Sequence, residues 1–395
     1  MKKINFQKSK VIQITISILL LAILAGILYW ANYDKPGYYK DRESGMEFET
    51  AKVLTVLEDK TVIDEQTEGI RRGSMLLQLE ILTGRYKGDV VETTNYFSSL
   101  YNVYVTEGDK VIVRVDNLDS GYSVSIYNYN RTNILLGFVL LFFLSLIIIG
   151  GKQGLRSVLG LVFTLVCVFF LLIPLVLKGF PPIPTTVVIL TLTTIVCFLL
   201  LGGLKPKIVS AILGTVFGVV FAAVLAIIVG MLTNISGFQM EEAESLLLIA
   251  TSSSLKIKGL FICGVLIATL GAVMDVAMSI SSAIEELHIN NPNMTFRELF
   301  ISGMNIGRDA MGTMANTLIL AFAGSGLNMV ITIYSYGVPF TQLINTDFVA
   351  VELIRGIAGS MGIVFTVPAV SIIASTMSTI IVKDSNFKWL SKIRK

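Results

Sequence analysis

Long apolar runs separated by short polar connections make up most of the chain, and this pattern predicts a membrane protein. A helix that crosses a bilayer needs about 20 predominantly apolar residues. Eight segments approach or exceed that length, so we predict eight spans. They are residues 11–30, 133–151, 157–177, 184–204, 208–232, about 259–284, about 311–335 and about 349–382. The last is too long for one straight span, so we expect it to tilt or to begin at the membrane surface, with Pro368 as a candidate kink.

Residues 31–132 follow a different pattern, in which short runs rich in β-branched and aromatic residues are separated by glycines. The runs are residues 51–57, 74–83, 90–95, 110–116 and 122–127. They predict a small β-barrel or sandwich, an OB-like arrangement being one option. The expected fold is therefore an all-α bundle of about eight transmembrane helices with an extracytoplasmic β domain. Its expected parts are an anchor helix (1–30), the β domain (31–132), a seven-helix membrane domain (133–385) and a basic tail (386–395).

Composition narrows the functional classes. Of the 395 residues, 53% are hydrophobic and only 15% are charged, whereas a soluble domain usually has about 25% charged residues. This excludes a soluble enzyme, a disordered chain and a nucleic-acid binder. Cys167, Cys197 and Cys263 all lie in apolar runs and His288 is the single histidine, so we expect no disulfide framework and no cofactor, and leave metal binding open.

The charged residues also indicate the orientation. Basic residues in short connections mark the cytoplasmic side of a membrane protein. With eight spans, the basic N-terminus, residues 152–156, residues 205–207 and the basic tail all fall on one side. We therefore predict that both termini are cytoplasmic and that residues 31–132, with 12 Lys/Arg against 17 Asp/Glu, are outside. Lys178, Lys256 and Lys258 fall on the other side and weakly oppose this orientation.

The sixth predicted span contains the first charge within an apolar run after the β domain. A charge near the centre of a bilayer costs about 2.5–3.5 kcal/mol on insertion scales. The spacing i, i+4, i+7, i+11 puts four side chains on one helix face. They are Asp275, Ser279, Ser282 and Glu286. We interpret them as a proton- or cation-binding carboxylate with hydroxyls lining a cavity; the alternative is a helix-packing stripe in which Asp275 pairs with a basic residue.

The next segment repeats this spacing. Thr295 and Glu298 form a capping-box pattern that predicts a helix start. The spacing i, i+4, i+7, i+11 recurs on that helix at Asn305, Asp309, Gly312 and Asn316, and Arg308 is adjacent. We interpret this face as opposing the Asp275 stripe, with Arg308 pairing a carboxylate or an anionic group. The alternative is an amphipathic helix at the membrane surface with ordinary solvated charges.

Three further features concern the candidate site or the packing of the helices. Glu352 and Arg355 are spaced i, i+3, which brings their charges together on a helix; the alternative is that both are solvated at the outer interface. The glycines of residues 324–326 could unwind a helix near a site. A seam of small residues in the fifth span predicts close helix packing: Gly214, Gly218, Ala222 and Ala226.

Three stretches together resemble a known family. They are GAVMDVAMSISSAIEEL, SGMNIGRDAMGTMANTLILAFAGSGL after an Asn-Pro pair, and ELIRGIAGSMGIVFTVP. They resemble the YibE/F-like family of bacterial multi-pass membrane proteins over about residues 130–385. The resemblance implies a bacterial plasma-membrane location and a protein usually described as a transporter candidate, and it supplies no substrate.

Two functions remain open on the sequence. The first is a secondary transporter or permease for a small solute or ion, with Asp275 binding a proton or cation. The second is a sensor or assembly component whose β domain binds a partner or an envelope ligand. The lipid bilayer is the expected environment, and a partner membrane protein or further copies of the chain are candidate partners. We expect no enzyme, because no HExxH or P-loop motif occurs and the only histidine lies in a connection.

Overall fold

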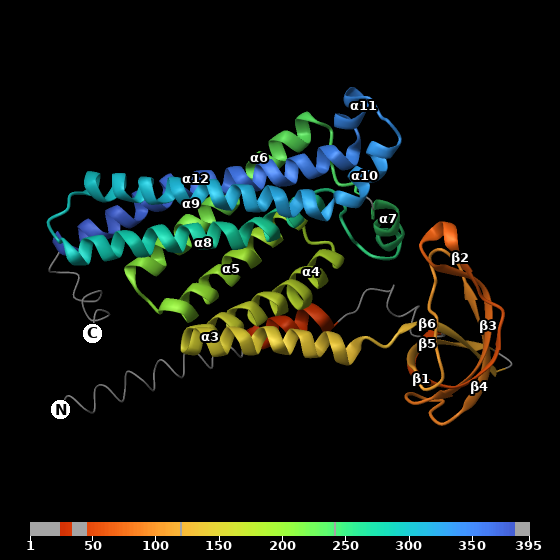
Figure 1. Cartoon of the computed structure of the whole chain (residues 1–395). Helices are drawn as coiled ribbons and strands as arrows, with labels where there is room; N and C mark the ends of the chain where they lie inside the picture. The colour runs from red at the N-terminus through yellow and green to blue at the C-terminus, as the bar shows by residue number, and fades with distance from the viewer. Residues whose placement is uncertain (1–23, 34–45, 119–120, 241, 384–395) are drawn as a thin grey trace, which may run out of the picture. The chain divides into compact units, whose positions relative to one another are not determined.

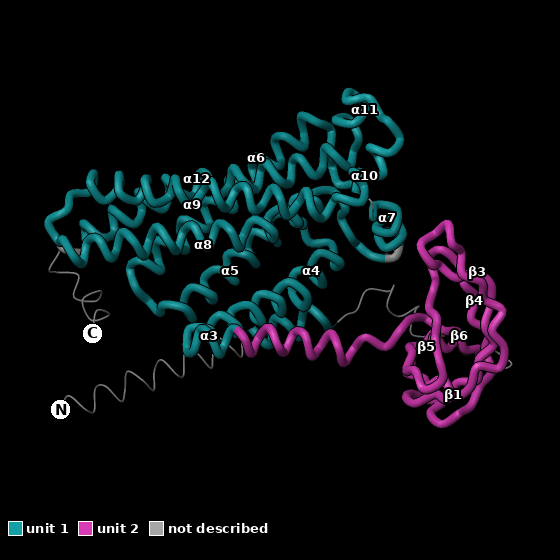
Figure 2. The backbone as a smooth tube through the Cα atoms, viewed as in Figure 1, with its two compact units in different colours: residues 1–36, 146–395 teal, residues 37–145 magenta. Residues whose placement is uncertain are grey.

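A computed structural model describes residues 24–33, 46–118, 121–240 and 242–383 (Figure 1). The chain forms two compact units, residues 37–145 and residues 1–36 with 146–395 (Figure 2). The first 23 residues of the predicted anchor and the predicted basic tail lie outside the described residues.

The β domain is an antiparallel sheet curved into a half-barrel. Its strands are β1 (Met46–Asp59), β2 (Val62–Asp64), β3 (Ile70–Ile81), β4 (Val90–Phe97), β5 (Lys110–Leu118) and β6 (Gly121–Tyr129). Their order is β2-β3-β1-β5-β6, with β4 paired to β3. All five predicted strands are present, and each is longer than predicted. The short β2 was missed because three mostly exposed residues give no alternating pattern.

Alternating side chains of the strands build the core of this domain. On β3 and β5 the inward residues Leu77, Leu79, Val111 and Val113 are fully buried. Between β4 and β6, the hydroxyl of Thr93 donates a hydrogen bond of 2.6 Å to the carbonyl of Val124. The result is a small, well-packed half-barrel.

The second unit is helical and contains nearly all of the apolar runs. Besides helical residues 24–33, its elements are α3 (Thr132–Cys167), a π-helical turn (Val168–Leu172), α4 (Ile173–Leu177), α5 (Pro182–Gly202), α6 (Pro206–Leu232), α7 (Ala243–Ser252), α8 (Leu260–Asn290), α9 (Phe296–Ser325), α10 (Leu327–Ser335), α11 (Phe340–Ile344) and α12 (Asp347–Lys383). Among the described residues, five helical stretches are long and apolar enough to cross a membrane, or six if α9 and α10 form one bent span.

One of these stretches, Thr132–Leu177, covers 46 residues, which is about 70 Å of helix and more than twice the bilayer core of about 30 Å. It is interrupted at Gly151, whose φ of 54° and ψ of −129° are not helical. A Cβ atom on Gly154 would collide with the carbonyl of Leu146. The chain therefore folds back closely after Gly151, where the sequence placed the connection between two spans.

Helix α12 is the centre of the helical unit, with α6, α8 and α9 packed around it (Figure 1). The predicted small-residue seam of α6 lies against α12. A side chain added at Gly214 would collide with Val370, and one added at Gly218 would collide with Thr366 and approach the Gly362 carbonyl. The seam therefore lets the two helices approach closely, which confirms the packing interpretation.

The predicted seventh span is not one straight helix. Helix α9 begins at Phe296 with the predicted capping box, in which Thr295 and Glu298 bond reciprocally. It ends at Ser325, and α10 continues at an angle of 59°. Gly326 lies at the bend with the ring of Phe348 against it. The glycines predicted to break the helix therefore do so.

The N-terminal helix packs against the π-helical turn and the end of α4. The side-chain amide of Asn32 donates to the carbonyl of Phe170 at 2.8 Å. The Lys178 ammonium donates to the carbonyl of Trp30 at 2.9 Å and lies over the Trp30 ring. Lys178, which opposed the predicted orientation, therefore has a structural role in anchoring this helix.

Candidate functional site

Helices α8 and α9 form an antiparallel hairpin that sets the depth of each polar side chain. Cβ atoms on Gly303 and Gly307 would touch Ile284 and Ile280, respectively. The same register places Asp275 level with Gly312. It likewise places Ser279 level with Arg308, and Ser282 level with Asn305. The two predicted stripes therefore lie at matching depths.

Both stripes face away from the core of the helical unit. Ser282 is half-buried, and the remaining side chains are exposed in the single chain: Asp275, Ser279, Glu286, Asn305, Arg308, Asp309, Gly312 and Asn316. We call these nine residues the α8–α9 polar face. The sequence predicted which residues share a helix face, and the structure places both faces on the outside of the helical unit.

The charged groups of the polar face are little engaged within the chain. The Arg308 guanidinium donates to the side-chain oxygen of Asn305 at 3.2 Å. Asp275 has no hydrogen bond or ion pair with any residue that the structure describes. The ion pair with a basic residue, which was the alternative interpretation of Asp275, is thus not formed inside the described part of the chain.

Glu352 and Arg355 lie elsewhere. They form the expected i, i+3 ion pair on α12, with an N–O distance of 2.5 Å and both side chains mostly buried. Ser360 donates to the carbonyl of Ala315, and this register puts Glu352 level with Ala323. Ala323 is eleven residues beyond Gly312 on α9, or about 16 Å along the axis. The structure does not bring this pair to Asp275.

A second ion pair joins α6 to α8 and was not foreseen from the sequence. The Lys207 ammonium lies 2.8 Å from the Glu285 carboxylate. Ser281 donates to the Lys207 carbonyl at 2.5 Å. Lys207 lies in a short basic connection and Glu285 lies off the Asp275 stripe, so only the tertiary contact reveals their pairing. Glu285 therefore fastens one end of α8 to the start of α6.

A family model described as YibE/F-like protein matches residues 138–380, which contain both α8 and α9 and the described part of α12 up to Ile380. The chain belongs to the YibE/F-like family. A second model, described as the YibE/F family N-terminal domain, matches residues 46–129, the β domain. Searches of curated proteins and of solved structures found no match.

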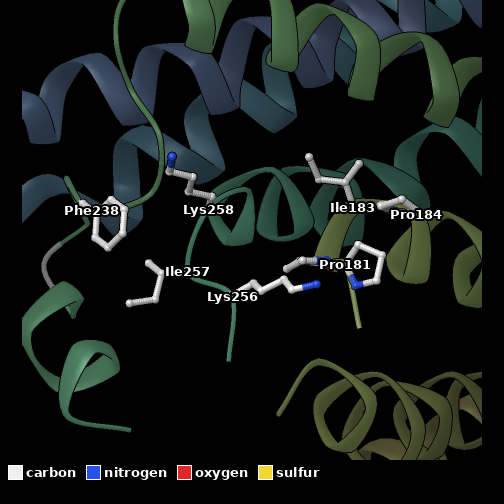
Figure 3. A pocket seen from close by; sticks show the side chains of 8 residues that line it. Pro181, Ile183, Pro184, Phe238, Lys256, Ile257 and Lys258 are labelled. Atoms are coloured by element: carbon white, nitrogen blue, oxygen red, sulfur yellow. The ribbon is translucent and has the colours of Figure 1, made fainter. Parts of the chain in front are cut away.

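The helical unit of this YibE/F-like protein also has a cavity of about 440 Å³ between the start of α5 and the segment before α8 (Figure 3). Its wall is largely apolar, with Pro181, Ile183 and Phe238 among the lining residues. Lys256 and Lys258 line it too, and Figure 3 shows their side chains running in different directions. The cavity thus lacks the convergent polar groups of a typical solute site.

A second cavity of about 420 Å³ lies between α6, α12 and α11, and its lining is almost wholly apolar. The polar face contributes no residue to either of these two cavities. In the described part of the chain, no group of three or more His, Cys, Asp or Glu side chains is placed to hold a metal ion. The α8–α9 polar face therefore remains the strongest candidate for function.

The YibE/F N-terminal domain has an exposed aromatic surface of its own. Tyr96 is 73% exposed, and Leu100 and Tyr101 follow it in a tight turn.

On the same domain the Tyr122 hydroxyl donates to Asp89 at 2.6 Å, which raises the pKa of Tyr122 to about 12. This tyrosine stays neutral at physiological pH, so Asp89 is held by a stable neutral donor.

Proposed function

We propose that this YibE/F-like protein is a secondary transporter or permease for a small solute or ion, with Asp275 binding the coupling proton or cation. The supporting observation is an unpaired carboxylate midway along α8, which spans Leu260–Asn290. Exposure of a charged carboxylate to lipid is costly, and intramembrane carboxylates usually mark ion or proton paths. The polar face supplies the hydroxyl and amide groups that such a path needs.

The proposed path runs along the polar face. Ser279 and Ser282 lie one and two helical turns from Asp275 and offer hydroxyl oxygens to a proton or cation. Arg308 lies at the level of Ser279, one turn in depth from Asp275. A guanidinium and a cation compete for the same carboxylate, so pairing of Arg308 with Asp275 would release the bound ion. The neighbouring helix α9 contributes Asn305, Asp309 and Asn316 to the proposed path.

The proposed topology has eight crossings in the bacterial plasma membrane, with both termini cytoplasmic and the β domain outside. Division of Thr132–Leu177 at Gly151 supports this count. The count of eight takes the N-terminal helix as one span and the bent α9–α10 pair as another. The Lys207–Glu285 pair would then lie near the cytoplasmic surface.

Proton movement in proteoliposomes tests the proposed function. Vesicles containing purified protein and a pH-sensitive dye are given an acidic outside and a series of external probes: Na⁺, K⁺, phosphate, and mixtures of amino acids or dicarboxylates. We expect at least one probe to accelerate internal acidification above that of protein-free vesicles. Asp275→Asn removes the titrating carboxylate but keeps its shape, so this variant is expected to lose the acceleration entirely.

Glu244→Gln is the matched control, because Glu244 is an exposed carboxylate on α7, away from the polar face. It should acidify as the wild type does. Equal rates for Asp275→Asn and wild type would refute the role of Asp275. If every probe leaves the wild type at the rate of protein-free vesicles, the transport proposal fails.

The exposed aromatic surface of the β domain favours a second candidate function, the binding of an envelope component or partner. Aromatic side chains are enriched at binding surfaces. A photo-crosslinking amino acid at Tyr101, introduced in the full-length protein in cells, is expected to give a discrete cross-linked product. The same probe at exposed Lys87 serves as a control. Identical patterns at both positions would count against a specific binding surface.

A further inference from the structure

The outward surfaces of α6 and α8 differ in a way that separates lipid contact from protein contact. On α6 the outward side chains are large and apolar: Leu213, Phe217, Val220, Val224 and Ile228. On α8, where Ile267 is an apolar exception, most outward positions spaced three or four residues apart are small or polar: Gly264, Ala268, Gly271, Asp275 and Ser279. The first set suits lipid tails. The second set is typical of a helix that packs against another helix.

The glycines of this outward surface have room in front of them. Cβ atoms on Gly264, Gly271 and Gly312 would meet nothing within 4 Å. Inside the unit, by contrast, Gly218 and Gly362 meet the opposing helix directly. The outer surface of α8 therefore has the small residues of the α6–α12 seam, but no helix of the described chain packs against it.

The charges on the polar face complement one another. Asp275 and Asp309 are acidic and Arg308 is basic, and each side chain is exposed on its own helix, outside the core of the helical unit. A symmetric contact between two identical chains requires a self-complementary surface. A different partner would instead have to supply charges of its own to match both signs.

We propose that a second copy of this chain covers the α8–α9 polar face, with a two-fold axis parallel to the membrane normal. Such an axis keeps every residue at its own depth, so α8 of one copy faces α9 of the other. Asp275 is level with Gly312, and Arg308 is four residues from Gly312, or about 6 Å along the axis. The long Arg308 side chain of each copy spans that offset and pairs with Asp275 of the other.

This dimer removes the exposed carboxylate and guanidinium from lipid and gives Asp275 the basic partner that it lacks in one chain. It goes beyond the proposed transport, because it depends only on α8 and α9 lying in a membrane. A dimer without flux would refute the transport proposal alone. Flux from a single chain would refute the dimer alone.

Cross-linking between two marked copies tests the proposed contact in membranes. The three native cysteines are replaced by alanine, and two differently tagged chains are co-expressed, one with Ser279→Cys and the other with Gly312→Cys. A short bismaleimide should join the two tagged chains, since each chain carries only one of the cysteines and the proposed contact brings them within about 6 Å of the same depth. Phe217→Cys, on the lipid-facing side of α6, replaces Ser279→Cys in the matched control and should give no product.

Light scattering in detergent gives the second measurement. We expect a protein mass of twice the 43.1 kDa of one chain. Asp275→Arg should reduce the mass to one chain, and the exchanged pair Asp275→Arg with Arg308→Asp should restore two. Single-chain particles for the wild type, equal cross-linking at Phe217, or cross-linking only to a different protein would each overturn the proposal.

Discussion

Gly218→Leu is expected to destabilise the helical unit by about 3 kcal/mol or more, because overpacking forces well-packed elements apart. A side chain at this position would collide with Thr366 on α12 and press on Val273 of α8. The carbonyl of Gly362 lies beside the same space. Three helices would have to separate, and the contacts along the whole α6–α12 seam would weaken with them.

The melting temperature in detergent measures this effect. It is determined from the amount of protein that stays monodisperse after heating. Gly137→Leu is the matched control, because Gly137 is an exposed helical glycine on α3 with no atom within 4 Å of an added Cβ. The control should melt close to wild type, while Gly218→Leu melts much lower or yields no folded protein. Equal melting of the two variants would contradict the assignment of the seam.

Arg355→Met is expected to cost about 3–5 kcal/mol of stability, the range for removing one partner of a buried ion pair. Its guanidinium is the ion-pair partner of Glu352, and only 18% of the Glu352 side chain is exposed. The second oxygen of Glu352 is buried without a partner among the described residues. Loss of Arg355 would therefore leave an uncompensated carboxylate among apolar helices.

The double variant Glu352→Gln with Arg355→Met removes the orphaned charge and should regain most of the lost stability in the same melting assay. Lys60→Met serves as the control pair, because Lys60 and Glu58 on the β domain are largely solvated, and such pairs contribute about 0–1 kcal/mol. If the double variant melts as low as Arg355→Met, then loss of packing rather than loss of charge balance explains the result.

Local patterns in the sequence were sufficient for much of this fold. The strands of the β domain follow from alternating β-branched residues, and the capping box at Thr295 follows from its spacing. The small residues of α6 predicted a close helix contact, although the sequence could not name α12 as the partner helix. The non-helical backbone at Gly151 lies where the sequence predicted a connection, while the close return of the chain against Leu146 depends on tertiary packing.

In the candidate site, too, local patterns predict some features and tertiary packing decides the others. A spacing of i, i+4, i+7 and i+11 fixes which residues share a face with Asp275, because helix geometry alone decides it. It does not decide whether that face meets the core or the outside, since this depends on the burial of the opposite face. The ion pair of Lys207 with Glu285 joins residues far apart in the chain, and no local pattern encodes such a contact.

The depth of Glu352 along the helical unit could not be predicted from the sequence either. The spacing to Arg355 predicted an ion pair and the structure has one, but the distance of this pair from Asp275 depends on the register between α9 and α12. The packing of Gly303 and Gly307 against α8 and α12 sets that register. We therefore interpret Glu352 and Arg355 as a stabilising pair and propose the path along the α8–α9 polar face.

The central claim is that the α8–α9 polar face does not face lipid. Nitroxide labels on single cysteines, Ser279→Cys on this face and Phe217→Cys on α6, measure it directly in liposomes through their collisions with dissolved oxygen, which concentrates in lipid tails. We expect high oxygen accessibility at Phe217, which is 46% exposed to the outside in the single chain, and a clearly lower value at Ser279, where water or a second copy excludes lipid. Equal, high oxygen accessibility at both positions would contradict this claim.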